Sequence, residues 1–537
     1  MTISFFRNEK INFSVLAFCL AAIIFVVYFH ALDFGFTNLD DNNSLHRIAD
    51  DLAKKTAFID VFKKDVMLGK SPTPYYRPMV ALSFVFDYKI AGESEWYSHF
   101  SCVALHCITT ILIFLFLKKY LLKKLLPSFL AALVFAVHPS CMYTVIWATG
   151  RNESLLLMNF LISLMFFIEY VNTKKLGFLV AHMFFILVCF FTKESGIIFP
   201  FITLLYFFLT KEKQQQLKIY IYLIWIALIL FFMISRKLAV NPGGFSIPFC
   251  KDNIVMFFDY YSSIFFLRTP FGVANMSLKL FFLGLSGFLL SLFLAFYNVT
   301  DKKIIKRNSF FVLITLISIG TNCMTATRLW FQGNRMYVPM LGVIIVFISF
   351  LTPYLENKKT KSWTIYCFSV IMLVCVATNV KASYKFKNSI AFWGNVINEN
   401  SSTEITSYKF HAYALMDNGR FQEAVNELLP IAQGLNFGYS EVNYALGSAF
   451  MLNKDYANAA KIFEIMVQTR QMLIPQVYAN VILAMHFSNN EEKVNYYFNE
   501  FMKTTNLDNA AANAYINNFN NFINTQRELD LSRPKTV

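Results

Sequence analysis

A series of apolar segments, each long enough to cross a bilayer, constrains this chain more than any other feature. Such a segment needs about 20 residues, and it must be helical because lipid offers the backbone no hydrogen-bond partners. We identify eleven, at residues 12–29, 99–117, 128–147, 154–171, 177–192, 196–210, 219–235, 278–297, 309–325, 337–353 and 363–380. The predicted fold class is therefore all-α, a polytopic membrane protein with about eleven transmembrane helices.

Composition divides the chain into two parts. Hydrophobic residues make up 56% of it and charged residues 15%, which is not the composition of a soluble protein. The apolar segments stop after residue 380, and the remainder is polar and rich in asparagine. We predict a membrane domain over 1–380 with a large external loop at 30–98, and a separate domain over 381–537. Charged residues interrupt 252–270, which we expect to lie along the external membrane surface.

Basic residues orient the membrane domain. They gather in alternate short loops, which the positive-inside rule places in the cytoplasm. These residues are Arg7, Lys10, Lys118, Lys119, Lys123, Lys124, Lys174, Lys175, Lys211, Lys213, Lys218, Lys302, Lys303, Lys306, Arg307, Lys358, Lys359 and Lys361. The tail then lies outside the cytoplasm. The net charge of +15 reflects this topology, so we expect contact with membrane lipid and no nucleic-acid partner.

The tail contains an internal repeat with a period near 35 residues. Ala412-Tyr413-Ala414-Leu415-Met416 aligns with Gly447-Ser448-Ala449-Phe450-Met451, and a weaker third copy runs from 478 to 498. Small residues at helix crossings and a period near 34 are typical of tetratricopeptide repeats. We predict a tetratricopeptide-like α-helical repeat domain, which offers a polypeptide-binding surface or caps the membrane domain.

Polar and ionisable side chains gather at the predicted external ends of the spans, where their burial cost makes a functional role the default reading. The candidate site residues are Asp40, Asp41, Tyr76, Arg77, His138, Arg151, Glu153, Lys193, Glu194, Arg328 and Arg335. Several have a structural alternative. Asp40 and Asp41 could be a solvated loop or a helix N-cap, Arg77 and Arg335 could anchor at the interface, His138 could end a helix, and Lys193 could pair with Glu194. Their placement on one side is the stronger signal.

This set of residue types suits transfer from a lipid-linked phosphate sugar. Arginine presents a planar fork that fits phosphate oxygens, and lysine presents a point charge. A carboxylate can accept the proton of an acceptor hydroxyl, and Asp40 or Asp41 is the candidate base. Because the leaving group is already a phosphate, stabilising its charge matters more than protonating it.

The order of the motifs resembles that of a known family. Asp40-Asp41, Tyr76-Arg77-Pro78, Phe135-Ala136-Val137-His138-Pro139, Gly150-Arg151-Asn152-Glu153, Lys193-Glu194-Ser195-Gly196 and Arg335-Met336-Tyr337-Val338-Pro339 precede the repeats. This pattern is similar to the transmembrane-and-tetratricopeptide-repeat protein O-mannosyltransferases of the GT-C glycosyltransferase superfamily. The resemblance implies a GT-C fold in the membrane domain and an inverting transfer of a sugar, expected to be mannose. The donor would be a polyprenyl-phosphate-linked sugar, and the acceptors would be Ser or Thr hydroxyls of translocated proteins.

The resemblance also suggests roles for individual residues. Asp40 and Asp41 would hold the catalytic carboxylate. Donor phosphate or substrate would contact Tyr76, Arg77, His138, Arg151, Glu153, Lys193, Glu194, Arg328 and Arg335. No His/Cys metal-ligand spacing is present, and whether Asp40, Asp41, Glu153 and Glu194 hold Mg²⁺ or Mn²⁺ is open.

The short repeat array fits a bacterial inner-membrane protein with its site and tail in the periplasm. In a eukaryote the corresponding place is the endoplasmic reticulum membrane. Two alternatives stay open. One is a bacterial O-oligosaccharyltransferase or ligase that uses a polyprenyl-linked glycan, although such enzymes rely on a large late loop. The other is a non-catalytic membrane scaffold, which would not need an acidic pair together with four external cations.

Overall fold

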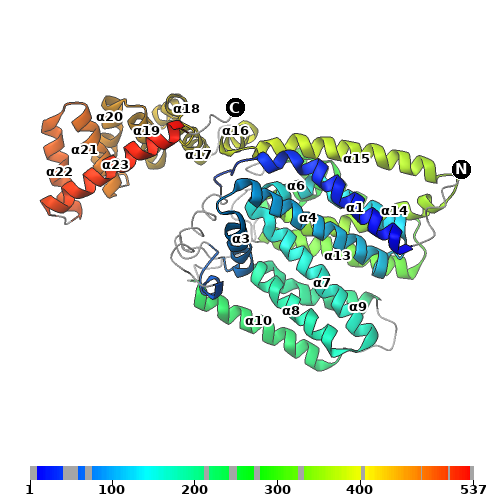
Figure 1. Cartoon of the computed structure of the whole chain (residues 1–537). Coiled ribbons are helices and arrows are strands. Elements are labelled where there is room, and N and C mark those ends of the chain that lie inside the picture. Colours follow the sequence, from blue (N-terminus) through cyan, green and yellow to red (C-terminus); the bar gives the residue numbers. More distant parts are fainter. Residues whose placement is uncertain are drawn as a thin grey trace. The chain divides into compact units, whose positions relative to one another are not determined.

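The computed structural model describes residues 9–39, 58–66, 75–210, 217–240, 251–270, 278–324, 332–400, 405–472, 474–505 and 508–532 (Figure 1). Within these ranges the regular structure is helical, and no strand occurs. The chain forms two compact units, Met1–Lys387 and Asn388–Val537. The predicted division after residue 380 falls inside α15 (Lys361–Ser383), so the first unit continues to the end of that helix and slightly beyond.

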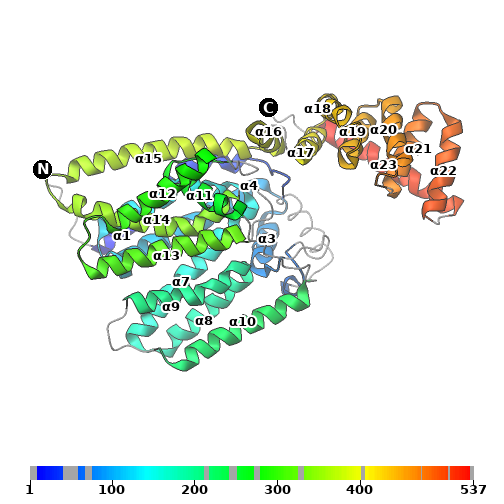
Figure 2. The same ribbon diagram turned by 180° about the vertical axis from the view of Figure 1, so that it is seen from behind.

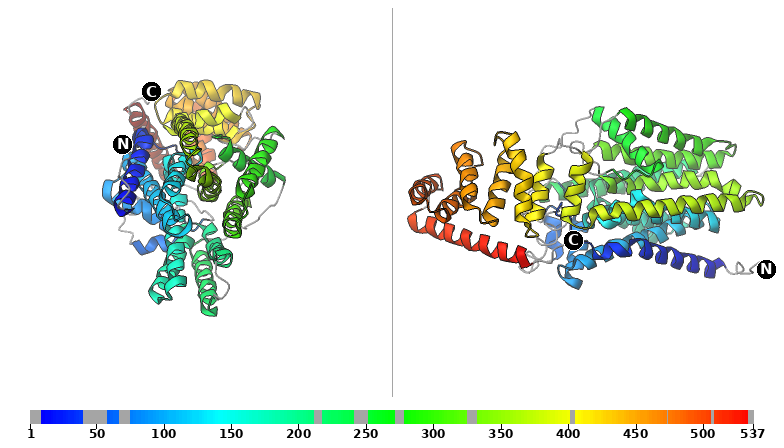
Figure 3. Two further views of the ribbon diagram at one scale, coloured as in Figure 1. Left: turned by 90° about the vertical axis from the view of Figure 1, so that its right-hand side faces the viewer. Right: turned by 90° about the horizontal axis from the view of Figure 1, so that it is seen from above.

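Every one of the eleven predicted segments coincides with an apolar helix. Among the described residues, eight helices are long and apolar enough to cross a membrane: α1 (Glu9–Tyr28), α4 (Glu95–Phe116), α7 (Arg151–Thr173), α10 (Ile219–Ala239), α12 (Leu278–Phe296), α13 (Lys302–Met324), α14 (Tyr337–Glu356) and α15. The helices of this unit run roughly parallel to one another (Figure 3). The predicted all-α, polytopic membrane fold class is confirmed.

The other three segments depart from a straight span. The segment at 128–147 is a pair of helices, α5 (Leu125–Val137) and α6 (Pro139–Ile146), bent by 58°. Pro139 stands at the first position of α6, where its ring and missing N–H prevent α5 from continuing. The remaining two, α8 (Leu176–Thr192) and α9 (Phe199–Thr210), are short and are joined through the 3-10 turn η5 (Glu194–Ile198).

The long loop before α4 contains structure of its own. It includes η1 (Phe29–Asp33), η2 (Phe58–Lys63) and α3 (Pro78–Ala91). Phe36, Val61, Val80 and Phe84 form a small buried cluster that also includes Ala148, just before α7. The loop is therefore packed onto the bundle around α3.

Helix α11 (Lys251–Phe265) occupies the segment that we expected to lie along the membrane surface. It is not among the candidate spans of the described residues, in agreement with the sequence. It packs closely against α12, with ring centroids 4.8 Å apart for Phe258 and Phe281 and 5.4 Å apart for Tyr261 and Phe288. This segment is thus part of the helix bundle.

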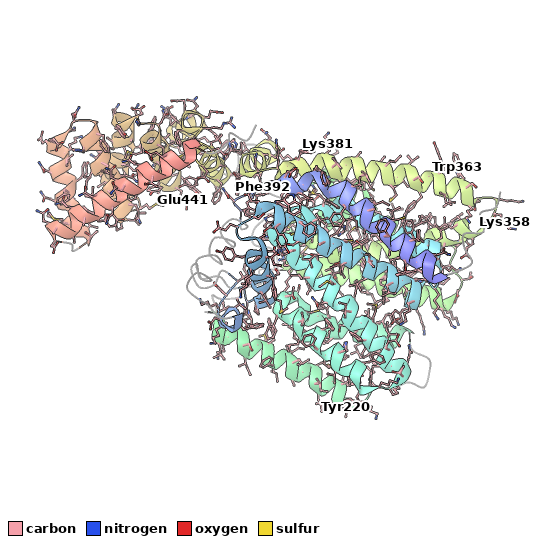
Figure 4. The ribbon with its side chains drawn as sticks, in the orientation of Figure 1. Tyr220, Lys358, Trp363, Lys381, Phe392 and Glu441 are labelled. Carbon is pink, nitrogen blue, oxygen red and sulfur yellow. The ribbon has the colours of Figure 1, made fainter. Side chains whose placement is uncertain are left out.

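The described parts of the basic loops that we predicted to be cytoplasmic come together at one end of the membrane unit. Lys119 Nζ donates to Glu169 Oε1 at 2.7 Å, and Lys124 pairs with Glu356. Lys358, just before α15, and Lys381, near the end of that helix, are labelled in Figure 4. The side of the membrane that each end faces stays a prediction.

The second unit is a succession of short helices in which each packs against the next. They are α16 (Ser389–Asn400), α17 (Ile405–Met416), α18 (Phe421–Gly434), α19 (Ser440–Leu452), α20 (Tyr456–Gln468), α21 (Pro475–Phe487), α22 (Glu491–Thr505) and α23 (Asn509–Ser532). Gly419, Lys454 and Asn489 each have positive φ, and they are spaced 35 residues apart. The backbone turn thus recurs with the period read from the sequence.

Replacing Ala459 by Asp should strongly destabilise the second unit. Ala459 is fully buried, so the substitution would place an unpaired carboxylate between packed helices at a cost of a few kcal/mol. We expect a lower urea midpoint for residues 388–537, followed by circular dichroism. Ala457→Asp is the matched control, because Ala457 lies on the exposed face of the same helix. Equal midpoints for both variants would contradict the packing.

Candidate functional site

Glu194 joins the start of α3 to the break between α8 and α9. Its Oε1 accepts a hydrogen bond from the backbone N of Tyr76, and its Oε2 accepts one from Arg77 Nε, both at 2.9 Å. The guanidinium of Arg77 also lies over the Tyr75 ring, 4.5 Å from its centroid. Within the described part of the chain, Nη1 and Nη2 of Arg77 make no hydrogen bond, so that edge can receive a ligand.

A glycine makes this arrangement possible. A Cβ on Gly196 would lie 2.5 Å from the carbonyl oxygen of Cys189, too close for any other residue without a backbone shift. The chain therefore folds tightly from the end of α8 into η5. This turn brings Lys193 and Glu194, two consecutive residues, toward two different elements.

Lys193 pairs with Glu153, in the first turn of α7. Both side chains are almost completely buried. Burial is the main reason why the pKa of Lys193 is lowered; the Glu153 carboxylate opposes this shift, and the charges of Arg335 and Arg77 add to it. Lys193 is therefore held among two further cations and one carboxylate.

Arg335 approaches the same group from the late part of the membrane unit. It lies in η6 (Gly333–Met336) and is buried, and its Nη1 donates to the carbonyl oxygen of Asn322 at 2.6 Å. Asn322 Nδ2 donates in return to the backbone oxygen of Arg335 at 2.8 Å. Burial raises the pKa of Tyr260, and the charges of both Arg335 and Glu153 act on its hydroxyl. Residues far apart in sequence thus share one electrostatic environment.

Arg151 is placed differently from the other predicted cations. It is fully buried and pairs with Asp87 of α3. Its Nε donates to the carbonyl of Ala148 at 3.0 Å, and its Nη2 donates to that of Ser98 at 3.1 Å. Protein atoms thus satisfy all three guanidinium nitrogens, so these contacts favour a structural role over phosphate binding.

Three ion pairs therefore connect three elements in a triangle. Arg77 and Glu194 join α3 to η5, Lys193 and Glu153 join η5 to α7, and Arg151 and Asp87 join α7 back to α3. Asp87 was missed in the sequence. A single carboxylate inside an apolar helix was the available signal, because a charge that is buried with the apolar face of a helix needs a partner. Tyr260 and Asn322 carried no comparable signal.

Two other predicted site residues also have structural partners. His138 caps α6, where its Nδ1 accepts a hydrogen bond from the backbone N of Ser140 at 3.1 Å. The hydroxyl of Tyr76 donates to the carbonyl of Phe62 at 2.7 Å. These contacts match the helix-end alternative for His138 and hold the residue before Arg77 in place.

Asp40, Asp41 and Arg328 lie outside the described residues. The chain leading to the acidic pair is described as far as Leu39. The backbone N of Phe36 donates to Glu95 Oε1 at 3.1 Å, and Thr37 is buried. The Phe36 side chain belongs to the cluster around α3, so the segment just before Asp40 is anchored beside the triangle.

The structure describes two of the four carboxylates that we considered as ligands of a divalent cation, and both form ion pairs. Glu153 pairs with Lys193, and Glu194 pairs with Arg77. Among the described residues, no group of three His, Cys, Asp or Glu side chains could hold a metal ion. The requirement for Mg²⁺ or Mn²⁺ stays open, because Asp40 and Asp41 are outside these residues.

Part of the site lies within a segment that matches a known family. Residues 72–235 match the model of dolichyl-phosphate-mannose-protein mannosyltransferases. This range contains Arg77, Glu153, Lys193 and Glu194, but not Arg335. The resemblance read from the motifs is confirmed over this segment.

Individual proteins of that kind are also similar to the chain. Human Protein O-mannosyl-transferase TMTC2 is 29% identical over 158 residues, which cover 29% of this chain and 18% of the relative. Mouse Protein O-mannosyl-transferase TMTC1 is 31% identical over 156 residues, which cover 26% of this chain and 16% of the relative. The chain thus spans less than a quarter of the length of either relative.

One solved structure aligns over most of the chain. It is ArnT from Cupriavidus metallidurans bound to undecaprenyl phosphate, with a TM-score of 0.39 and 13% sequence identity. The alignment covers 85% of this chain and 80% of that one.

Replacing Asp87 by Asn should destabilise the membrane unit. The buried guanidinium of Arg151 would lose its charge partner, and breaking a buried pair in this way costs about 3–5 kcal/mol. We expect a clear fall in the thermal unfolding midpoint of the detergent-solubilised chain. Asp60→Asn is the matched control, because it removes a carboxylate from the exposed pair with Lys63. An equally small shift in both variants would mean that Arg151 does not depend on Asp87.

Proposed function

We propose that this chain is an inverting membrane glycosyltransferase with a GT-C-like membrane domain. It moves a sugar, mannose in the first instance, from a polyprenyl-phosphate donor to Ser or Thr hydroxyls of an exported protein. The observation that carries this proposal is the gathering of Arg77, Lys193 and Arg335 at one electrostatic site, largely within the segment that matches the mannosyltransferase family.

The cations of this site suit the phosphate of the donor. The outer edge of Arg77 has two nitrogens without a protein partner among the described residues, and Glu194 fixes the plane of the guanidinium through Nε. Because the guanidinium group of Arg77 is already held in place, it loses little side-chain entropy when it binds phosphate oxygens. Lys193 and Arg335 add positive charge where water is largely excluded, which strengthens the attraction.

The reaction needs a base and stabilisation of the leaving group. The acceptor hydroxyl oxygen attacks the anomeric carbon from the face opposite the phosphate, while its proton passes to a carboxylate. The bond from the anomeric carbon to the phosphate oxygen breaks, and its electron pair leaves with the polyprenyl phosphate. Cations already in place stabilise the charge that develops there without costly reorganisation.

We assign the base to Asp40 or Asp41. Support comes from the anchored segment before the pair, since Phe36 packs with Val80 and Phe84 of α3, the helix that begins directly after Arg77. Glu153 and Glu194 are poorer candidates because each is committed to a lysine or an arginine. Within this proposal the site and the second unit are on the external side, the periplasm in a bacterium or the lumen of the endoplasmic reticulum in a eukaryote. The second unit then offers its helical surface to the acceptor.

Changing Asp40 and Asp41 together to Asn should abolish sugar transfer. The amides keep the size of the side chains but cannot accept the proton, and losing general base catalysis costs about 10²–10⁴-fold in rate. The measurement is transfer of radiolabelled mannose from polyprenyl-phosphate mannose to a Ser/Thr peptide in membranes that contain the full chain. Near-normal transfer by the double variant would favour a non-catalytic scaffold.

Changing Arg77 to Lys should weaken donor use while the fold persists. Lysine keeps the charge but loses both the contact from Nε to Glu194 and the forked edge. We expect a higher KM for the lipid donor, by about tenfold, as for the loss of one charge-assisted hydrogen bond. Arg470→Lys, on the exposed surface of the second unit, is the control. An unchanged KM for the lipid donor would mean that Arg77 does not bind the donor and has only a structural role.

A further inference from the structure

A second charged hollow lies away from the proposed site, at the end of the membrane unit where the basic loops meet. It has a volume of about 720 Å³ and lies among α7, α9, the start of α13 and the turn after α4. Helices α7, α9 and α13 run side by side there (Figure 2). Four basic side chains and one carboxylate line it: Lys119, Lys123, Lys303, Arg307 and Glu169.

The single carboxylate is already engaged. Glu169 Oε1 accepts hydrogen bonds from Lys119 Nζ and from the hydroxyl of Tyr120, both at 2.7 Å. The side chains of Lys123 and Lys303 have no ion-pair partner among the described residues. The lining of the hollow therefore carries an excess of positive charge, although the carboxylate of Asp301, outside the lining, also acts on Arg307.

Arg307, which also lines the hollow, has one guanidinium nitrogen without a partner in the described structure. Its Nη2 donates to Ser349 Oγ at 3.0 Å, while its Nε is buried and has no hydrogen-bond partner in the described structure. A buried donor without a partner costs about 1–3 kcal/mol. An arginine that only followed the positive-inside rule could extend into water, so this burial requires another explanation.

The backbone at the entrance has an unusual form. Helix α4 ends in a short π-helix, η3 (Leu117–Leu121), which contains Lys119 and Tyr120. Lys123 follows with a left-handed backbone, at a φ of 53°. Turns of the π type in helices occur frequently at functional sites. Here the π turn and the left-handed residue supply two of the four basic side chains of the hollow.

The remaining walls are mostly apolar. Leu121, Val171 and Ile304 line the hollow and are partly exposed, whereas Phe167, Tyr206 and Phe207 line it but are almost fully buried. A free anion would not use these surfaces, whereas the glycerol and upper acyl carbons of a phospholipid would. Basic pockets between transmembrane helices are suited to phosphate head groups.

We propose that this hollow is a binding site for a phosphate group, carried by an anionic phospholipid of the adjoining leaflet. Lys123 and Lys303 attract the phosphate, and Arg307 satisfies its buried Nε with a phosphate oxygen. The site is separate from the proposed donor site, and it holds whether or not the chain transfers sugar.

The test measures lipid binding to the purified full-length chain in mild detergent by native mass spectrometry. Phosphatidylglycerol is titrated against phosphatidylcholine, and glycerol phosphate is used as the soluble source of the same group. We expect saturable binding of phosphatidylglycerol that is about 30-fold weaker in the Lys123→Gln/Lys303→Gln variant, since each basic residue near anionic lipid contributes a factor of about five. Both lysines are exposed, so folding should be unaffected.

The matched control is Lys358→Gln/Lys359→Gln, which removes the same charge from an exposed loop at the same end. Retained binding in this control together with loss in the pocket variant supports the site. Equal loss in both variants would reduce the effect to the general charge of the basic loops and overturn the proposal, as would unchanged binding in the pocket variant. Competition by glycerol phosphate at similar concentration would identify a soluble phosphate as the ligand and overturn the lipid assignment.

Discussion

The triangle of ion pairs, two of them buried and the third, between Arg77 and Glu194, half-buried, is the constraint on which the candidate site depends. Charges that leave water must find partners, and removing one member of such a pair strands the other. Here α3, α7 and η5 are each joined to the other two by one pair, so none of them can shift without exposing or stranding a charge. The site is thereby preorganised around Arg77, the one arginine of this group whose outer nitrogens are left available by the described residues.

This arrangement also explains why similar residues have different roles. Arg77 and Arg151 both stand near the start of a helix and both follow motifs rich in small or aromatic residues. Arg151 uses its nitrogens on Asp87 and two carbonyl oxygens, whereas Arg77 uses only Nε on Glu194. Arg151 therefore helps to hold the three elements together, whereas Arg77 is positioned by them with its outer nitrogens available.

The sequence predicted the spans well because bilayer thickness and backbone hydrogen bonding leave little choice of structure. All eleven segments appear as helices. The hydropathy pattern did not predict the 58° bend at Pro139, because hydropathy is averaged over a window longer than such a break. The contact of α11 with α12 was missed as well, since Asp259 looked exposed in the sequence but is buried and paired with the partly exposed Arg268.

The sequence predicted that several of the candidate residues lie close together, but it did not predict which of them pair. Polar residues at span ends identified Arg77, Glu153, Lys193, Glu194 and Arg335, all of which gather at one end. Adjacency in sequence suggested that Lys193 and Glu194 pair with each other, yet each reaches a different partner. The tight turn at Gly196 separates them, and the partners come from elements that only tertiary packing brings close. Asp87 was missed for the same reason.

The triangle has a consequence for how the chain is made. Asp87 and Arg151 are 64 residues apart, whereas Arg77 and Glu194 are 117 apart, so the first pair can close well before the second. At about 5–20 residues per second, Arg77 emerges on the order of 6–25 seconds before its carboxylate is synthesised. During that interval its charge must stay in water or against lipid head groups. The turn carrying Lys193 and Glu194 then completes the triangle in one step, so insertion of α8 is the event that commits the nascent membrane unit to its final arrangement.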